Sequence, residues 1–317
     1  MLKITWFLLA FTLIVLAVCY EINKNETETE TEIKVKLSNA KDSLSYILGA
    51  KIAQEIVKET GKDFARLNKE QIIIGFNSDI KSYSPSKCIS AIQKLFGKNF
   101  QDFNEKYVSE GSLNIGIYSA YSFYYDIRKV RGNDYVNKSL VYKGYADGLY
   151  KKDAFLSNGL KEQIAYNFYV GLNEKHGAKM MAQAKLIKGA QLFENGVVIE
   201  TIKAGNGPMP GLTDDVKVHY ILTSAVGDTI QNSFEMTNNE NKIEPVALSL
   251  NGGVIPGWSY AIPKMKVGGT YRLYLPWELA YGEQNRRESL CFVVELVARV
   301  KSGSFTDLKE NKPGEKK

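Results

Sequence analysis

Side chains able to carry acid–base, nucleophilic or metal chemistry are scarce in this sequence. Its 317 residues include two histidines and three cysteines. His176 and His219 lie far apart, and Cys19, Cys88 and Cys291 each stand alone, so the chain has neither the spacing of a zinc site nor a Cys-His pair. The composition therefore disfavours histidine-based catalysis, and we expect neither a metal nor another cofactor.

Glycines and aromatic residues form a series of motifs in the last third of the chain. The motifs read NGGVIPGW at 251–258, MKVGG at 265–269, LAYG at 279–282 and CFVVEL at 291–296. In this order they resemble the catalytic domain of FKBP-type peptidyl-prolyl isomerases over about residues 196–301, and the match is specific only as a combination. The resemblance implies a twisted antiparallel half-barrel wrapped on one short helix that carries Trp258.

The resemblance also implies a pocket whose chemistry needs no proton transfer. Rotation about an X-Pro bond meets a barrier of about 18–20 kcal/mol and is slow without a catalyst. A dry aromatic pocket favours the twisted amide, which has lost resonance. The implied catalytic residues are Tyr220, Trp258 and Tyr281, and the implied substrate-binding residues are Gln231, Asn232, Val246, Val254, Ile255 and Phe292. Ordinary core packing is the alternative role for each of them.

Several of these positions depart from the family pattern. Gln231 stands where the family has phenylalanine, Asn232 where it has aspartate, and Val246 where it has a larger aromatic wall residue. Only residues 283–289 separate the LAYG motif from the last strand, whereas the family carries a longer loop over the pocket. Both changes admit water. The leading hypothesis is an exported isomerase of low activity that assists the folding of envelope proteins. The alternative is a binding or chaperone module of the same fold in an envelope complex.

The hydrophobic period of the chain changes near residue 196. From Asp42 onward, apolar residues recur at three and four positions, which predicts helices, the longest running from Gly159 to about Glu194. Beyond residue 196, apolar and polar residues alternate, which predicts strands as far as Val300. The predicted fold class is α+β, an all-helical N-terminal half followed by an antiparallel half-barrel with one short helix.

The helical half contains a pattern that occurs twice. The residues around Gly49 match those around Gly116 at an offset of 67, and Asn68 with Gly75 matches Asn137 with Gly144 at an offset of 69. Two helical hairpins that merely look alike are the alternative. The sequence DSLSYILG at 42–49 resembles the dimerisation segment of the macrophage-infectivity-potentiator class of these isomerases, which pairs with its copy in a second subunit. Two copies in one chain predict an internal pseudo-dimer, and a homodimer is the alternative.

The N-terminus predicts export. Lys3 precedes an apolar run, Ile4–Val18, of the length of a secretory signal. The sequence LAVC at 16–19 resembles a bacterial lipobox and implies lipidation of Cys19, with an uncleaved signal anchor as the alternative. Residues 20–32 contain five glutamates and one lysine, which predicts a charged flexible spacer. We therefore expect a protein tethered to a membrane of the bacterial cell envelope, on the periplasmic side or at the cell surface.

The charge distribution bears on the partners. The net charge is +6, but basic residues are interleaved with acidic ones, so we expect no nucleic-acid binding; unfolded or proline-containing polypeptides are the expected partners. The expected segments are a signal at 1–19, an acidic tether at 20–41, a first helical repeat at 42–110, a second repeat with a long connecting helix at 111–195, an isomerase domain at 196–301 and a polar tail at 302–317.

Overall fold

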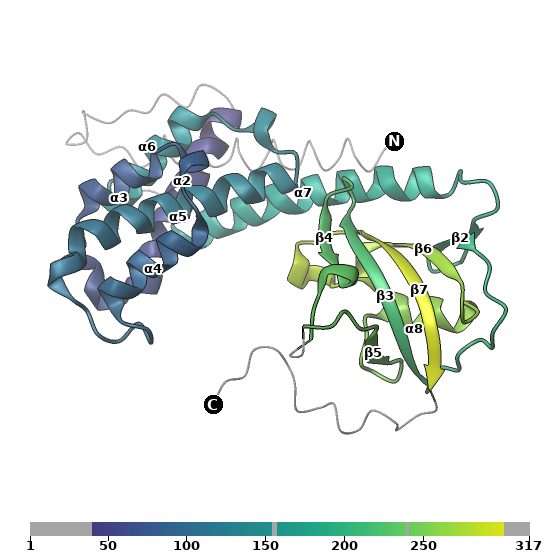
Figure 1. The fold of residues 1–317 in the computed structure, drawn as a ribbon. Helices are drawn as coiled ribbons and strands as arrows, with labels where there is room; N and C mark the ends of the chain where they lie inside the picture. Colours follow the sequence, from purple (N-terminus) through teal and green to yellow (C-terminus); the bar gives the residue numbers. More distant parts are fainter. Residues whose placement is uncertain (1–39, 154–156, 239–240, 301–317) are drawn as a thin grey trace. The chain divides into compact units, whose positions relative to one another are not determined.

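The protein divides into two compact units, and the boundary between them falls between Tyr169 and Val170 (Figure 1). The computed structural model describes residues 40–153, 157–238 and 241–300. The expected signal, Cys19, the acidic run at 20–32 and the polar tail lie outside these residues. Within the described ranges, no helix is both long enough and apolar enough to cross a membrane.

The first unit is helical, as the sequence predicted. Its helices are α2 (Ala40–Thr60), α3 (Lys69–Phe76), α4 (Pro85–Phe96), α5 (Val108–Lys129) and α6 (Lys138–Leu149), and α7 (Asn158–Ala184) begins in it and continues into the second unit. Local signals start these helices. The Asn68 side chain accepts a hydrogen bond from the backbone N–H of Gln71 at 3.0 Å, and Ser84 caps α4 one residue before Pro85.

The helices pack in a crossed arrangement. Helix α2 lies along α6, whereas α3 lies along α5, and α4 also packs on α5. A Cβ atom added to Gly49 of α2 would collide with the carbonyl oxygen of Val141 in α6. One added to Gly116 of α5 would collide in the same way with Ile72 of α3. Glycine is therefore required at both crossings, because each pair of backbones touches directly.

Each of these two crossings also has a glycine on its second helix. Gly144 of α6 leaves no room for a Cβ beside Tyr46, and Gly75 of α3 leaves none beside Leu113. Two hydrogen bonds repeat the relationship. The hydroxyl of Ser45 accepts the backbone N–H of Asn137 at 2.8 Å, and that of Ser112 accepts the backbone N–H of Asn68 at 3.0 Å. The offset of 67 relates Ser45 to Ser112, and the offset of 69 relates Asn68 to Asn137, so the second contact repeats the first.

Helix α7 is shorter than the sequence predicted. It ends at Ala184 rather than near Glu194, and Leu186, which lies beyond its end, is 84% exposed. The residues beyond the helix form strand β1 (Gln191–Leu192), which pairs with β2 (Val198–Lys203). The prediction was wrong here because Gly189, with φ at 84°, turns the chain back toward the sheet.

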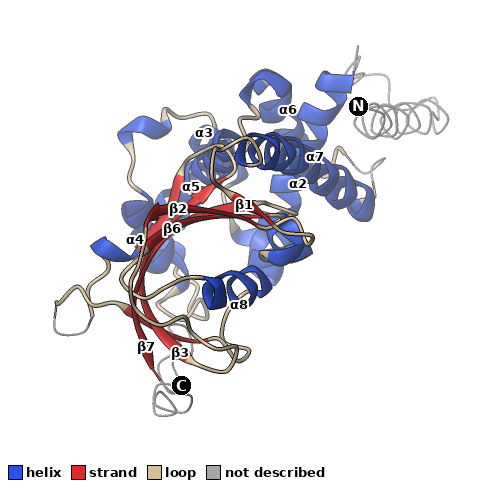
Figure 2. Cartoon of the chain, turned by 90° about the vertical axis from the view of Figure 1, so that its right-hand side faces the viewer, coloured by secondary structure: helices blue, strands red, loops and turns tan. Residues whose placement is uncertain are grey.

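The second unit is one antiparallel sheet curved around a short helix (Figure 2). Its further elements are β3 (Asp215–Ser224), β4 (Thr229–Asn232), β5 (Val246–Ser249), α8 (Pro256–Ala261), β6 (Thr270–Leu275) and β7 (Leu290–Val300). The strand order is β1-β2-β6-β7-β3-β4, and β5 also pairs with β3. Alternate residues of β6, namely Tyr271, Leu273 and Leu275, are buried in the core that contains Trp258. The predicted α+β fold class is confirmed.

Candidate functional site

Three aromatic rings meet in the core between the sheet and α8. Trp258 of α8 stands edge-on to Tyr220 of β3, with 5.4 Å between ring centroids and 90° between ring planes. It also stands edge-on to Phe292 of β7, at 5.1 Å and 77°. Trp258 and Phe292 are 4% and 2% exposed, whereas Tyr220 is half-buried. Edge-to-face pairs contribute about 0.5–1.5 kcal/mol beyond burial, so these rings form a rigid aromatic surface.

The short helix α8 places Trp258 in this cluster. Pro256 occupies the first turn of the helix, and the carbonyl of the preceding Ile255 accepts the backbone N–H of Trp258 at 2.9 Å. Gly257 has no room for a side chain, because Leu275 and the backbone of Leu279 lie against it. The buried indole Nε1 of Trp258 has no hydrogen-bond partner among the described residues. Since buried donors are normally paired, this N–H is available to a ligand.

The wall of the site contains a tyrosine–glutamine pair. The hydroxyl of Tyr220 donates a hydrogen bond to Oε1 of Gln231 at 2.8 Å. Burial, followed by the nearby Tyr281, raises the pKa of Tyr220 above its ordinary value. Tyr220 therefore stays protonated at neutral pH and acts as a donor. Its partner is a neutral amide, as the departure at position 231 implies.

Asn232 takes a different role from Gln231. Its Oδ1 accepts the backbone N–H of Phe234 at 3.1 Å, and its Nδ2 donates to Glu235 at 2.7 Å. These bonds cap the turn that follows β4. In this structure Asn232 makes no hydrogen bond with Tyr220 among the contacts of the described residues, so its role in substrate binding stays a prediction.

The predicted rim residues surround the aromatic cluster. Val246 of β5, Val254 and Ile255 are half-buried and pack on the core that contains Trp258. Tyr281 is 47% exposed, and its proximity contributes to the raised pKa of Tyr220. The fold thus gathers the predicted catalytic and substrate-binding side chains in one region, with Asn232 turned toward Glu235.

The short loop before β7 is held by the C-terminal part of α7. Asn173 donates through Nδ2 to the carbonyl of Arg286 at 2.9 Å, and Arg287 forms ion pairs with Glu174 at 2.8 Å and Glu283 at 2.7 Å. Arg286 and Arg287 both have positive φ, 48° and 56°. Such residues cost about 1–3 kcal/mol each and persist only where other contacts hold them. These contacts therefore hold the short loop in one conformation.

Sequence reasoning missed two features beside the site. The buried hydroxyl of Ser233 accepts the backbone N–H of Tyr220 at 2.7 Å, and the ring of His219 stacks on Phe234 at 4.5 Å. Both contacts join β3 to the turn after β4. No sequence signal identified them, because they depend on the pairing of two strands and on the turn that joins them.

The site can act through shape and hydrogen bonding. Within the described ranges, no group of three or more histidine, cysteine or acidic side chains could hold a metal ion. Burial raises the pKa of the Cys291 thiol to about 11, so this cysteine is neutral and a poor nucleophile at neutral pH. What remains is an aromatic floor, a free indole N–H and a tyrosine–glutamine wall. These groups suit a small apolar ring and the amide bond next to it.

Comparisons with known proteins point to one family. Residues 207–297 match the family of FKBP-type peptidyl-prolyl cis-trans isomerases. The chain is 30% identical over 191 residues to the FKBP-type peptidyl-prolyl cis-trans isomerase FkpA of Aeromonas hydrophila, covering 54% of this chain and 68% of that protein. It is 26% identical over 183 residues to the outer membrane protein MIP of Legionella longbeachae, covering 51% of this chain and 76% of that protein.

A solved structure is also similar. The crystal structure of FkpA from Escherichia coli aligns with 64% of this chain and 99% of that chain, at 26% identity and a TM-score of 0.39.

Proposed function

The chain belongs to the family of FKBP-type peptidyl-prolyl cis-trans isomerases, and from this premise we propose that it is an exported isomerase that assists protein folding in the bacterial cell envelope. The observation that carries the proposal is the aromatic floor of Trp258, Tyr220 and Phe292 next to the Tyr220–Gln231 hydrogen bond.

The proposed mechanism follows from the chemistry of the amide bond. Twisting the X-Pro bond removes its resonance and its charge separation, so a surface of low polarity stabilises the twisted form relative to the planar one. The indole N–H of Trp258 and the backbone N–H of Ile255 are donors that hold the peptide. Tyr220 keeps its proton, and no group of the site has to transfer one. Catalysis therefore depends on how dry the pocket is.

The second candidate function is a binding or chaperone module with weak catalysis. The amide of Gln231 and the short loop held by Arg287 favour it, because both leave the pocket more open to water. The two functions are separable by experiment.

We propose to assay the full chain in detergent micelles for isomerisation of a proline-containing peptide. In parallel, the same chain is assayed for suppression of the aggregation of an unfolded protein. Aggregation suppression without isomerisation would replace the enzyme with the module.

We also propose that the helical unit is an internal pseudo-dimer of two repeats, 42–110 and the part of 111–195 that precedes the long connecting helix α7. The support is the matched set of crossings at Gly49, Gly116, Gly75 and Gly144. The covalent connection holds the two copies at roughly millimolar effective concentration, which favours pairing within one chain. The unit would then present no unpaired copy to a second chain.

For the tether, we propose lipidation at Cys19 and attachment to a membrane of the envelope. The support is the sequence LAVC at 16–19 and the similarity to the outer membrane protein MIP of Legionella longbeachae. Labelled palmitate should enter the natural protein in bacterial cells and should not enter the Cys19→Ala variant. Incorporation into both proteins would contradict this site.

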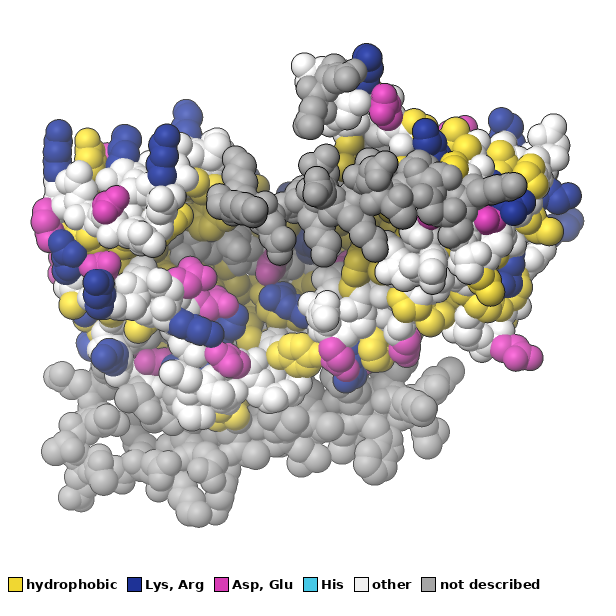
Figure 3. Space-filling model, turned by 90° about the horizontal axis from the view of Figure 1, so that it is seen from below, with side chains coloured by type: hydrophobic (Ala, Val, Ile, Leu, Met, Phe, Trp, Pro, Cys, Tyr) yellow, Lys and Arg dark blue, Asp and Glu magenta, His cyan; other side chains and the backbone are white. Residues whose placement is uncertain are grey.

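The proposed partners are unfolded and proline-containing polypeptides. Basic and acidic side chains are interspersed on the face shown in Figure 3, so this face is not a uniformly basic surface of the kind that binds nucleic acid. An uncharged, partly apolar peptide is a better match for the aromatic floor of Trp258 and Phe292. Binding of a proline-containing peptide that does not weaken as salt rises would support this choice.

A further inference from the structure

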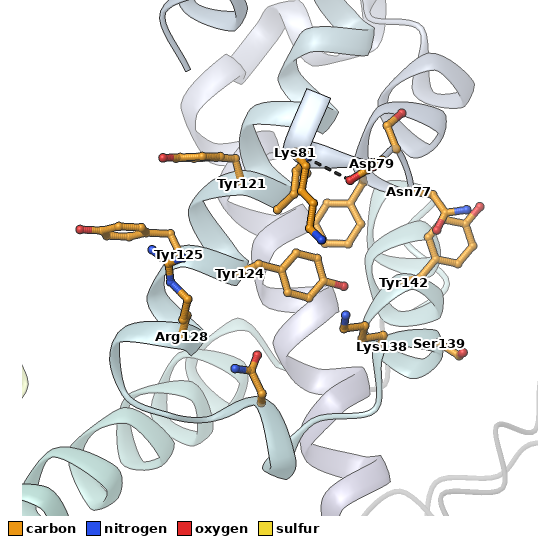
Figure 4. A pocket seen from close by; sticks show the side chains of 14 residues that line it. Asn77, Asp79, Lys81, Tyr121, Tyr124, Tyr125, Arg128, Lys138, Ser139 and Tyr142 are labelled. Atoms are coloured by element: carbon orange, nitrogen blue, oxygen red, sulfur yellow. Dashed lines mark hydrogen bonds between the residues drawn. The ribbon is translucent and has the colours of Figure 1, made fainter. Parts of the chain in front are cut away.

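The helical unit contains a groove that is separate from the isomerase site. Its volume is about 840 Å³, and it lies between the end of α3, the middle of α5 and the start of α6 (Figure 4). The lining residues are Phe76, Asn77, Ser78, Asp79, Ile80, Lys81, Tyr121, Tyr124, Tyr125, Arg128, Asn133, Lys138, Ser139 and Tyr142. Neither the family match nor the isomerase reaction involves this groove.

Aromatic side chains form much of the groove. Tyr124 lies near its middle, with its ring 6.4 Å from that of Phe76, and burial raises the pKa of Tyr124. Tyr121 and Tyr125 stack along one wall at 6.3 Å, and Tyr125 is 45% exposed. Exposed tyrosines that carry both a flat ring and a hydroxyl are typical of surfaces that bind an extended chain.

The groove is also basic. Lys81, Arg128 and Lys138 line it, against a single carboxylate, Asp79. Among the described residues, none of these three side chains forms an ion pair. The Nζ atom of Lys138 lies 5.5 Å from the centre of the Tyr124 ring. Lys81 and Lys138 extend toward Tyr124 in Figure 4. The groove therefore suits an extended segment that carries several carboxylates and little bulk.

We propose that this groove binds the acidic segment of the same chain, residues 25–33. That segment reads NETETETEI, with Glu26, Glu28, Glu30 and Glu32 at every second position. In an extended bound form, alternate side chains point to the same side. The four carboxylates then face the basic groove together, while the threonines face away. A polar segment with this alternation therefore matches the charge of the groove.

The described start of the chain lies beside the groove. Helix α2 begins at Ala40, and Oδ1 of Asp42 lies 3.3 Å from Nδ2 of Asn137, the residue that precedes Lys138. Seven residues, 33–39, separate Glu32 from Ala40. An extended chain covers up to about 3.3–3.6 Å per residue, so these residues span as much as roughly 25 Å. The acidic segment can therefore reach the groove of its own chain without strain.

Docking of this segment has two consequences. It shortens the distance between the helical unit and whatever holds the N-terminus, because the acidic run no longer acts as a free spacer. It also keeps the basic groove closed to acidic segments of other polypeptides. Both effects weaken as salt rises, since the contact is electrostatic and partly exposed.

The first test measures competition for the groove. A fluorescent peptide with the sequence of residues 25–33 is titrated with the full chain in detergent micelles, and its anisotropy is followed. The natural chain is compared with a variant in which Glu26, Glu28, Glu30 and Glu32 are all replaced by glutamine. We expect the peptide to bind the variant at least about tenfold tighter, because the tethered segment no longer competes at millimolar effective concentration.

Controls show where the peptide binds. In the glutamine background, Lys81→Glu with Lys138→Glu should remove binding, whereas Lys62→Glu with Lys87→Glu should not. Lys62 and Lys87 are exposed, lie in the same unit and are absent from the groove. Three outcomes would each overturn the proposal. The peptide could bind the natural and glutamine chains with equal affinity, or show no measurable binding to the glutamine chain. The third is that both pairs of lysine substitutions weaken peptide binding equally.

The second test observes the contact directly. A photoreactive phenylalanine derivative replaces Tyr125 in the full chain, and the cross-linked product is mapped by mass spectrometry. We expect cross-links within one chain to residues 25–33, and we expect them to decrease in high salt and in the glutamine variant. Cross-links that join two chains, or that fall only on residues 40–169, would overturn the intramolecular assignment.

Discussion

The hydroxyl of Tyr220 donates its hydrogen bond to a neutral amide, Oε1 of Gln231, 2.8 Å away. A hydrogen bond to a carboxylate would be roughly twice as strong and would hold the ring more firmly. The amide also brings its own N–H donors to the wall, one of which lies 3.5 Å from the sulfur of Met236. The wall of the pocket is therefore polar and uncharged at this pair.

Rebuilding a dry wall should raise isomerase activity. In the full chain, Gln231→Phe with Asn232→Asp should increase kcat/KM several-fold, because phenylalanine excludes water and an aspartate can accept the Tyr220 hydrogen bond. Glu235 lies 2.7 Å from the Asn232 amide, so a new carboxylate there would be repelled. Glu235→Gln is therefore added, and Glu235→Gln alone is the control. The variant could have the same melting temperature as the natural chain and show no increase in kcat/KM. In that case, either the short loop limits activity or the pocket binds peptides without catalysing isomerisation.

Trp258 is best tested by a conservative change. Trp258→Ala would cost about 3–5 kcal/mol in stability and confuse folding with function. Trp258→Phe keeps most of the core contacts but removes the unpaired indole N–H. We expect kcat/KM to fall about tenfold, equivalent to roughly 1.4 kcal/mol. Phe64→Leu, a buried change in the helical unit, should leave kcat/KM unchanged. If Trp258→Phe also leaves it unchanged, Trp258 is only a core residue.

The glycine crossings give a prediction about stability. Gly144→Ala should destabilise the helical unit by about 1–3 kcal/mol, because the new methyl group meets the backbone of Tyr46. Gly159→Ala is the matched control, since nothing lies within 4 Å of its Cβ position in α7. That change should be neutral or stabilising, by up to about 1 kcal/mol, because alanine favours helix. Urea unfolding measures the free energy of unfolding of both variants. Equal changes in the two variants would show that the α2–α6 contact is not tight.

The oligomeric state follows from the crossed packing. A chain lacking residues 1–32 should be monomeric, because each helical pair already covers the other within one chain. Light scattering at several concentrations gives the mass. A mass of two chains that persists on dilution would restore a homodimer and contradict the internal pseudo-dimer.

The buried thiol of Cys291 predicts a loss of stability at high pH. Its pKa is about 11 in the folded protein because of burial, against an ordinary value of 9.0. Folding therefore favours the protonated thiol. The stabilisation is complete below pH 9 and is lost as the pH rises toward 11. The free energy of unfolding should fall over this range in the natural chain and fall less in Cys291→Ala. Parallel curves would show that the thiol does not contribute.

The sequence by itself determined the features that depend on neighbouring residues. The start of α4 at Ser84-Pro85 and the start of α3 after Asn68 follow from local capping, which needs only a few adjacent side chains. The two unlike halves follow from hydrophobic period. The positions of Tyr220, Trp258 and Phe292 in a pocket were implied by the resemblance of the motifs to the isomerase family.

Only the tertiary structure decided which of these elements meet. The pattern indicated two similar helical pairs. However, the crossings of α2 with α6 and of α3 with α5 depend on backbones that are distant in the sequence and fit together at glycines. The partner of the Tyr220 hydroxyl and the end of α7 at Ala184 depend likewise on strand pairing and on the turn at Gly189. Contacts of this kind are chosen by packing over the whole unit, because the local sequence is compatible with several alternatives and burial selects among them.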